Sequence, residues 1–259
     1  MPGGGLKMRS VLVEIGSFTL YSYGMMLLMA FVLGLFLILR EAPRKGFNPD
    51  HIYEAFILSI ILTVLGARIT YVFLNWELYQ GEPLLRTLIA RETGLTFYGG
   101  LIAVLLGLFV HCHYRKISFL KLIDFIVPFI ALGYGITRIG CFLNGCCYGH
   151  ITTLPWGVAF PLLDGVPRHP TQLYGVLAGL VMFVLLRYMG KYSFFDGYIF
   201  LFFFVFYGIY RFIVEFFRVS EPVLWFLTPA QLMSLLLILV ALSFFLWKRN
   251  NNKYSLHLR

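Results

Sequence analysis

The chain consists largely of apolar runs that are long enough to cross a lipid bilayer. About 20 residues of α-helix span the roughly 30 Å of hydrocarbon in a membrane. Seven such runs follow one another, at residues 18–39, 53–74, 95–112, 122–136, 171–186, 197–214 and 230–247. The sequence therefore predicts an all-α integral membrane protein of about seven transmembrane helices, in a single domain over residues 1–259.

The composition supports a surface that faces lipid. Hydrophobic residues make up 59% of the chain, charged residues make up 13%, and the mean hydropathy is +0.81. A soluble domain needs more polar surface than this. The net charge of +9 comes from basic residues that mostly flank the apolar runs. This placement favours contact with anionic lipid head groups, and we expect no nucleic-acid partner because no basic patch with interleaved aromatic residues is present.

The distribution of basic residues predicts the orientation. One alternate set of loops, together with the C-terminal tail, holds twelve Lys and Arg residues, and the opposite set holds seven. Because cytoplasmic loops carry the excess, the N-terminus is predicted outside and the C-terminus in the cytoplasm. Lys7 and Arg9 precede the first run without a small-residue cleavage site, so we expect that run to be a retained helix.

A polar, glycine-rich stretch from Thr137 to His150 interrupts the apolar pattern, and the chain then continues to Pro167-Arg168-His169-Pro170. With the predicted orientation, a small head segment at about 137–170 faces outward. Gly133 and Gly135 precede Arg138, and they allow close approach of either a neighbouring helix or a ligand.

Three arginines are candidates for binding a phospholipid head group: Arg68, Arg138 and Arg211. A charge inside the hydrocarbon costs roughly 2.5–3.5 kcal/mol on insertion scales, and a guanidinium donates two parallel hydrogen bonds to a phosphate. Snorkelling to the interface is the alternative for Arg68. Arg211 and Glu215 share a helical face, so a structural ion pair is the alternative there.

Cys141, Cys146 and Cys147 lie in the same stretch. Their spacing does not match the paired C-x-x-C pattern of structural zinc sites, so no metal is predicted. A disulfide from Cys141 to one of the other two is one alternative, and three small buried apolar side chains are the other. Cys112 is expected to be inert.

His169 has two interpretations. A His-Pro pair before a helix is often a turn or cap, and an imidazole that titrates near neutrality also suits a general base. The sequence contains no G-x-S-x-G, H-E-x-x-H, P-loop or dinucleotide fingerprint. No cofactor is therefore predicted.

Six motifs occur in one order over about residues 23–231. They are Gly66-Ala67-Arg68-Ile69-Thr70-Tyr71-Val72, Phe97-Tyr98-Gly99-Gly100-Leu101-Ile102, Asp124-Phe125-Ile126-Val127-Pro128, Arg138-Ile139-Gly140-Cys141-Phe142-Leu143-Asn144-Gly145, Arg168-His169-Pro170-Thr171-Gln172-Leu173-Tyr174 and Tyr210-Arg211-Phe212-Ile213-Val214-Glu215-Phe216-Phe217-Arg218. In these motifs the chain resembles the bacterial prolipoprotein diacylglyceryl transferases, a family with seven spans and an outward N-terminus.

The resemblance implies a transferase of the bacterial inner membrane with two substrates. The diacylglyceryl group of phosphatidylglycerol would move to the lipobox cysteine thiol of a preprolipoprotein, as the first step of lipoprotein maturation. A thioether would form and glycerol phosphate would leave. Such chemistry needs a charge-neutralised phosphate and a deprotonated thiol. The thiol belongs to the substrate, so none of the four cysteines of this chain needs to be catalytic.

The resemblance also implies site residues. Arg138 matches the phosphatidylglycerol-binding arginine, and Arg211 matches the essential arginine before I-V-E-F-F-R. Together with Tyr98 and His169 they form the expected catalytic set. The expected substrate-binding set is Arg138, Arg68, Asn144, Tyr23, Gly99, Gly100, Gly149 and Glu215.

Three positions depart from the family pattern. Tyr98 stands where the family usually has His, Cys141 where Asn is frequent, and Gly175 where Glu is frequent. The base could therefore be Tyr98 or His169, or a lowered thiol pKa could suffice. We expect phosphate activation by Arg138 and Arg211 as the main effect, with Tyr98 orienting. The alternatives are a divergent paralogue with altered acceptor or lost activity, and a lipid-binding or transport protein, although a transporter should show internal repeats.

Overall fold

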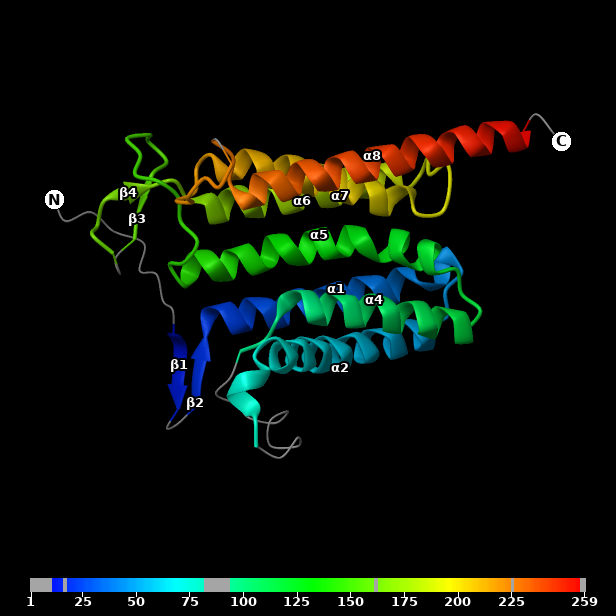
Figure 1. Cartoon of the computed structure of the whole chain (residues 1–259), viewed down its shortest axis with the longest axis horizontal. Coiled ribbons are helices and arrows are strands. Elements are labelled where there is room, and N and C mark those ends of the chain that lie inside the picture. The colour runs from blue at the N-terminus through cyan, green and yellow to red at the C-terminus, as the bar shows by residue number, and fades with distance from the viewer. Residues whose placement is uncertain (1–10, 16–17, 82–93, 161–162, 225, 257–259) are drawn as a thin grey trace. The chain divides into compact units, whose positions relative to one another are not determined.

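Seven helices of the described chain are long and apolar enough to cross a membrane. The computed structural model describes residues 11–256 apart from 16–17, 82–93, 161–162 and 225. The helices are α1 (Ser22–Glu41), α2 (Pro49–Leu74), α4 (Phe97–Tyr114), α5 (Phe119–Leu143), α6 (Thr171–Met189), α7 (Tyr198–Glu215) and α8 (Pro229–Leu256) (Figure 1). The predicted multi-pass, all-α membrane fold is confirmed, and the orientation of its termini stays a prediction.

The predicted start of the first transmembrane run, at residue 18, is wrong. Residues 18–21 form strand β2 (Phe18–Tyr21), which pairs antiparallel with β1 (Val11–Ile15), and α1 starts only at Ser22. Apolar composition alone does not separate a buried strand from a helix turn in so short a segment.

The predicted start of the head segment, at about residue 137, is also wrong, because α5 continues to Leu143. Arg138 and Cys141 therefore lie in the last turns of a helix and not in a loop. The glycines suggested a break, but a Cβ on Gly140 would lie 2.9 Å from Met26 Cβ and 3.1 Å from Tyr23 Cα. Glycine is tolerated inside this helix because it lets α1 approach closely.

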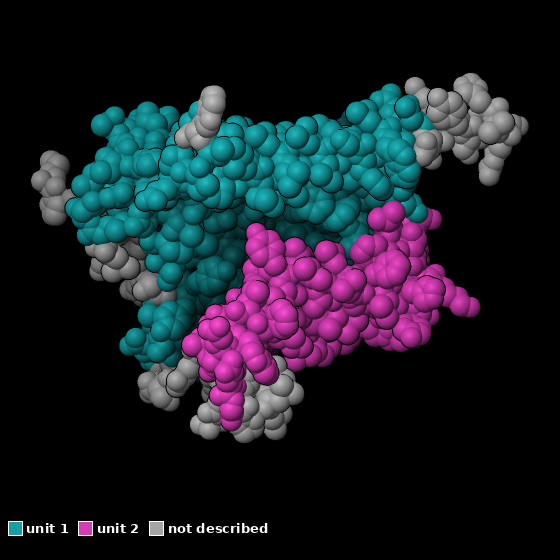
Figure 2. Space-filling model, viewed as in Figure 1, with its two compact units in different colours: residues 1–36, 123–259 teal, residues 37–122 magenta. Residues whose placement is uncertain are grey.

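The chain forms two compact units (Figure 2). Unit 1 comprises Met1–Phe36 and Ile123–Arg259, and unit 2 comprises Leu37–Leu122. The prediction of a single domain stays a prediction.

Unit 2 is built on the antiparallel packing of α2 against α4. Asn48 caps α2 by accepting a hydrogen bond from the Asp50 backbone N–H, and Pro49 occupies the first turn. The glycines that open α4 let the two backbones meet, since a Cβ on Gly100 would lie 2.8 Å from the Thr63 carbonyl oxygen. The 3-10 helices η1 (Pro43–Lys45) and η2 (Trp76–Tyr79) also belong to this unit.

Unit 1 contains α6, α7 and α8 and most of α1 and α5. Gly135 of α5 and Gly179 of α6 face each other, so that a Cβ on Gly179 would lie 2.8 Å from the Gly135 Cα. Asp124 of α5 accepts hydrogen bonds from the backbone N–H groups of Gly197 (2.7 Å) and Phe200 (2.9 Å). This carboxylate caps α7, which gives the Asp124 motif a structural role that the sequence did not reveal.

The segment between α5 and α6 is held by short backbone pairings. Strand β3 (Val158–Ala159) pairs with β4 (Pro167–Arg168), and Gly149 forms an isolated bridge with Arg218. The Gly149 N–H donates to the His169 carbonyl (2.9 Å) and the His150 N–H to the Phe217 carbonyl (2.8 Å). These bonds join the end of α5, the start of α6 and the end of α7.

Candidate active site

Arg138 is held by aromatic side chains of unit 1. Its guanidinium lies 4.8 Å from the centre of the Tyr134 ring, one turn earlier on α5. The Tyr134 hydroxyl donates a hydrogen bond of 3.1 Å to the Tyr210 hydroxyl of α7. Among the residues that the structure describes, no carboxylate forms an ion pair with Arg138. Its positive charge is therefore available to an anionic ligand.

Gly175 makes room for this arrangement. A Cβ at this position would lie 2.9 Å from both Arg138 Cγ and the Tyr210 hydroxyl oxygen. A larger side chain here would meet the Arg138 methylene groups. Gly175 thus fits the position of Arg138 in this chain.

Arg211 is held in a different way, by the buried carboxylate of Glu215. The Glu215 side chain is 3% exposed. It also accepts hydrogen bonds from Ser220 Oγ (2.7 Å) and Thr228 Oγ1 (3.2 Å), and Arg218 Nε lies 3.8 Å away. The ion pair that the sequence left open as the alternative is present. Binding of a head group by Arg211 stays a prediction.

Tyr207 of α7 connects the surroundings of these arginines, because it interacts electrostatically with Arg138, Arg211 and Arg218. Its ring lies 5.8 Å from that of Tyr134. The positive charges of these arginines favour an anionic ligand in this part of unit 1.

An open apolar groove of about 550 Å³ runs along α6 and α7. It is lined by Leu154, Trp156, His169, Tyr174, Leu177, Ala178, Val181, Tyr210, Ile213, Val214 and Phe217. Tyr210 therefore belongs both to the groove and to the hydrogen bond beside Arg138. A groove of this kind suits an acyl chain.

His169 stands at one end of the groove. The Tyr174 hydroxyl oxygen lies 3.0 Å from its Nδ1 atom and accepts a hydrogen bond from Trp156 Nε1 (3.0 Å). The centre of the His169 ring lies 5.0 Å from that of the Phe217 ring. Its carbonyl accepts from the Thr171 N–H at the start of α6, so the predicted turn role is present together with an imidazole that faces the groove.

Tyr23, Asn144 and Gly149 also lie in unit 1. Tyr23 is in the first turn of α1, beside Gly140, and interacts electrostatically with Arg138. Asn144 follows the last residue of α5 and is half-buried. A Cβ on Gly149 would lie 2.8 Å from His169 Cβ, which explains this glycine by packing alone. The ligand roles of these residues stay predictions.

The remaining predicted residues belong to unit 2. Arg68 is 5% exposed, lies 5.6 Å from the Tyr79 ring centre and 5.9 Å from that of Tyr71, and donates a long hydrogen bond (3.4 Å) to the Gly94 carbonyl. Gly99 and Gly100 pack against α2. Tyr98 is 65% exposed in the first turn of α4. Substrate contacts of these residues stay predictions.

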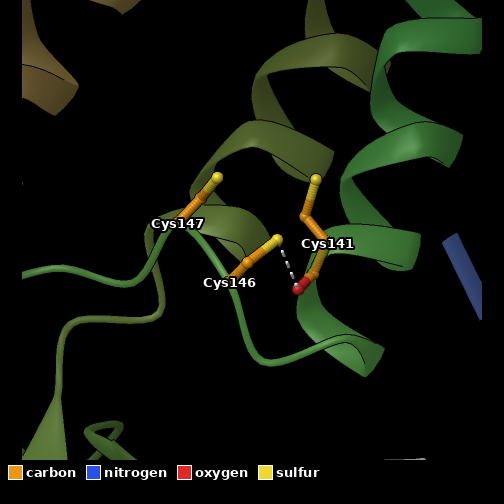
Figure 3. Close-up of side chains that lie close together, drawn as sticks. All are labelled: Cys141, Cys146 and Cys147. Atoms are coloured by element: carbon orange, nitrogen blue, oxygen red, sulfur yellow. Dashed lines mark hydrogen bonds between the residues drawn. The ribbon is translucent and has the colours of Figure 1, made fainter. Parts of the chain in front are cut away.

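The three cysteines come together at the end of α5 (Figure 3). Their sulfur atoms all lie within 4.8 Å of one another, and all three thiols are free. The neighbouring Cys141 thiol, together with the charges of Arg218 and Arg138, lowers the pKa of Cys147 below its usual range. Of the two alternatives for these cysteines, the disulfide is not formed.

The sequence did not identify Tyr134, Tyr210, Ser220 or Thr228 as parts of the site. A signal was present for Tyr134, which precedes Arg138 by one helical turn, and for Tyr210, which precedes Arg211 in the last motif. The groove gave no signal, because its apolar lining resembles any lipid-facing helix surface.

Comparisons with a family model and with known proteins all point to the same family. The family model for prolipoprotein diacylglyceryl transferase matches residues 10–247. A phosphatidylglycerol–prolipoprotein diacylglyceryl transferase of Geobacter sulfurreducens is 36% identical over 241 residues, which covers 90% of this chain and 92% of the relative. Proteins of the same name are 37% identical in Mannheimia succiniciproducens (82% and 80% covered) and 32% identical in Vibrio parahaemolyticus (95% and 92% covered). The chain belongs to the prolipoprotein diacylglyceryl transferase family.

Proposed function

We propose that this protein transfers the diacylglyceryl group of phosphatidylglycerol to the lipobox cysteine of preprolipoproteins. The acceptor sulfur attacks the glyceryl carbon that carries the phosphate, a C–S bond forms and the C–O bond breaks. The electron pair stays on the phosphate oxygen, and glycerol phosphate leaves. This is the first step of lipoprotein maturation, and we place it in the bacterial inner membrane.

The observation that carries the proposal is the position of Tyr210. This side chain lines the apolar groove and also accepts the hydrogen bond from Tyr134, on whose ring Arg138 rests. An acyl chain in the groove would thus extend from a head group near an arginine without a carboxylate partner among the described residues. A phospholipid has this combination of an apolar chain and an adjacent anion.

Arg138 would neutralise the phosphate as it leaves. Charge-assisted donors directed at the developing negative charge contribute roughly 10²–10³ in rate each. Arg211 would add a second positive charge whose orientation is fixed by Glu215.

The acceptor thiol must also lose its proton. His169 faces the groove in unit 1, and Tyr98 begins α4 in unit 2. We assign Tyr98 an orienting role. We assign the role of proton acceptor to His169, because an imidazole is the side chain that most often serves as a general base.

A direct assay tests the function. Purified protein in liposomes is supplied with phosphatidylglycerol labelled in its acyl chains and with a lipobox peptide. We expect label on the peptide cysteine and none on a peptide with Ser in its place. Complementation of a strain depleted of its own transferase extends the test to natural acceptors. The divergent positions Tyr98 and Cys141 favour one second candidate, a paralogue with another acceptor. Label on no lipobox peptide, together with failed complementation, would establish that candidate instead.

A further inference from the structure

The cluster of Cys141, Cys146 and Cys147 has the geometry of a metal site with an open position. The three sulfurs lie within 4.8 Å of one another. Three thiolates on one tetrahedral Zn²⁺ lie about 3.8 Å apart, given Zn–S bonds of about 2.3 Å. Small side-chain rotations therefore suffice to bring these sulfurs onto one ion.

The loop that carries the cluster is held in place by hydrogen bonds of its backbone groups. These bonds leave the sulfur atoms available to bind a metal. The Cys147 carbonyl accepts from Thr171 Oγ1 (2.5 Å) and the Cys146 carbonyl from Gln172 Nε2 (2.6 Å). The Cys146 N–H donates to the Cys141 carbonyl (3.1 Å). Cys147 adopts a left-handed conformation with φ of 62°, which is uncommon for a residue with a side chain and is frequent at functional sites.

The number of ligands distinguishes this cluster from a structural zinc site. Structural sites use four protein ligands, whereas catalytic sites use three and leave the fourth position to water or substrate. In the part of the chain that the structure describes, no fourth His, Cys, Asp or Glu joins the group. Cys141 is buried, while Cys146 and Cys147 are half-buried, so two of the three cysteines are partly exposed.

We propose that Cys141, Cys146 and Cys147 hold Zn²⁺ as thiolates and that its fourth position takes the acceptor cysteine thiol. This inference rests on the proposed function. An ion held by these residues would supply a Lewis acid that favours the thiolate form of the acceptor cysteine, whose proton would pass to His169, the base of the proposed function. The acceptor sulfur would then form its bond to the glyceryl carbon as the C–O bond breaks, and the electron pair would leave with the phosphate oxygen.

The position and the charge of the cluster agree with this role. Cys141 follows Arg138 by three residues, so their Cβ atoms are about 5–6 Å apart on one face of α5. A Zn²⁺ ion with four thiolates carries two negative charges. Arg138 and Arg218 both interact electrostatically with Cys147 and would offset them. The acceptor sulfur would thus be activated beside the arginine that holds the phosphate.

Metal content of the purified protein is the first test. Protein reduced and freed of metal is titrated with Zn²⁺ and, separately, with Co²⁺, whose thiolate charge-transfer absorption reports the sulfur ligands. We expect one equivalent in the wild type and in Cys112→Ser, which removes a buried cysteine of unit 2. Loss of the band is expected in Cys141→Ser and Cys147→Ser. No metal uptake, or a disulfide among the three cysteines in protein isolated without reductant, overturns the proposal.

The acceptor peptide supplies a second test that does not depend on turnover. Adding a lipobox peptide to the Co²⁺ form should change the charge-transfer band, and the peptide with Ser for Cys should not. An unchanged band contradicts the assigned role of the fourth position. Removing Zn²⁺ from an active preparation should slow transfer by at least about 10²-fold, the lower range for assisted proton removal. If the peptide binds to the metal but no lipid is transferred, the proposed function fails and the metal site stands.

Discussion

Arg138 rests on the Tyr134 ring, whereas Arg211 is paired with the buried carboxylate of Glu215. Both arginines lie in unit 1, on the neighbouring helices α5 and α7. Among the described residues, Arg138 has no carboxylate partner, while the charge of Arg211 is already compensated inside the protein. We therefore expect an incoming phosphate to gain most from Arg138, and we expect Arg211 to be shared between Glu215 and the ligand.

This difference gives Arg138 and Arg211 different roles, although the sequence analysis predicted the same role, phosphate activation, for both. An arginine held by neutral aromatic groups costs desolvation energy that a bound anion can offset. An arginine in an ion pair is fixed in orientation, and its removal leaves a buried carboxylate behind. We therefore expect Arg138 to govern rate and Arg211 to govern rate and stability together.

The largest effect is expected for Arg138→Gln. Loss of the guanidinium should lower the rate of transfer from phosphatidylglycerol by roughly 10³-fold, because the developing charge on the phosphate loses its main donor. Arg138→Lys keeps the charge but loses the planar fork, and it should retain only part of the rate. The measurement is initial rate in liposomes at saturating peptide.

The matched control is Arg115→Gln in unit 2. Arg115 forms an exposed ion pair with Glu54 at 2.6 Å, and its side chain is 45% exposed. Its loss should change the rate by less than about threefold, since exposed pairs contribute little. Equal rates for Arg138→Gln and the wild type would contradict the distinction between the two arginines.

Arg211→Gln tests the other half of the comparison. It leaves Glu215 buried beside fewer positive charges, which should lower the free energy of unfolding by about 3–5 kcal/mol. The double variant Arg211→Gln with Glu215→Gln should regain most of the thermal stability, but its rate should stay about 10²-fold below that of the wild type. Thermal unfolding in detergent and the transfer assay report the two effects separately.

A double variant that regains both stability and rate would reduce Arg211 to a structural residue. The ion pair would then be the whole function of this position. If instead the single variant unfolds like the wild type, the network around Glu215 does not depend on Arg211. Either result would remove Arg211 from the proposed mechanism.

Gly175→Ala tests whether the position of Arg138 matters as much as its charge. The added methyl would lie 2.9 Å from Arg138 Cγ and would move the side chain. We expect a rate loss of roughly 10-fold, because small misplacements of a catalytic group are costly. Gly34→Ala in α1 is the control, since a Cβ there meets nothing within 4 Å. Equal rates for both variants would show that Arg138 adapts freely.

The fold was largely predictable from the sequence, because helices in a membrane need long apolar runs. The errors lay where local composition misleads. Residues 18–21 are apolar but form a strand, and the glycines near Arg138 resemble a loop although α5 continues through them. Glycine in a helix is decided by the partner that packs against it, here Tyr23 and Met26 of α1.

The site was predictable only in part. Arg211 and Glu215 are four residues apart, so their pairing follows from helix periodicity. The hydrogen bond between Tyr134 and Tyr210 joins residues 76 apart in the chain, and no local pattern predicts it. The same holds for the three sulfurs, whose meeting depends on a turn that folds Cys147 back towards α5.

The smallest effect is expected for Tyr210→Phe, which removes one hydroxyl and leaves the ring in the groove. The lost hydrogen bond from Tyr134 contributes about 0.5–1.5 kcal/mol, so the rate should fall roughly two- to tenfold. Tyr188→Phe is the matched control, because Tyr188 is 59% exposed near the other end of α6. The binding of phosphatidylglycerol should weaken less than the rate falls, since the groove itself is unchanged. A loss confined to lipid affinity would instead mean that Tyr210 serves the acyl chain alone, and the link between the groove and Arg138 would then have to run through another residue.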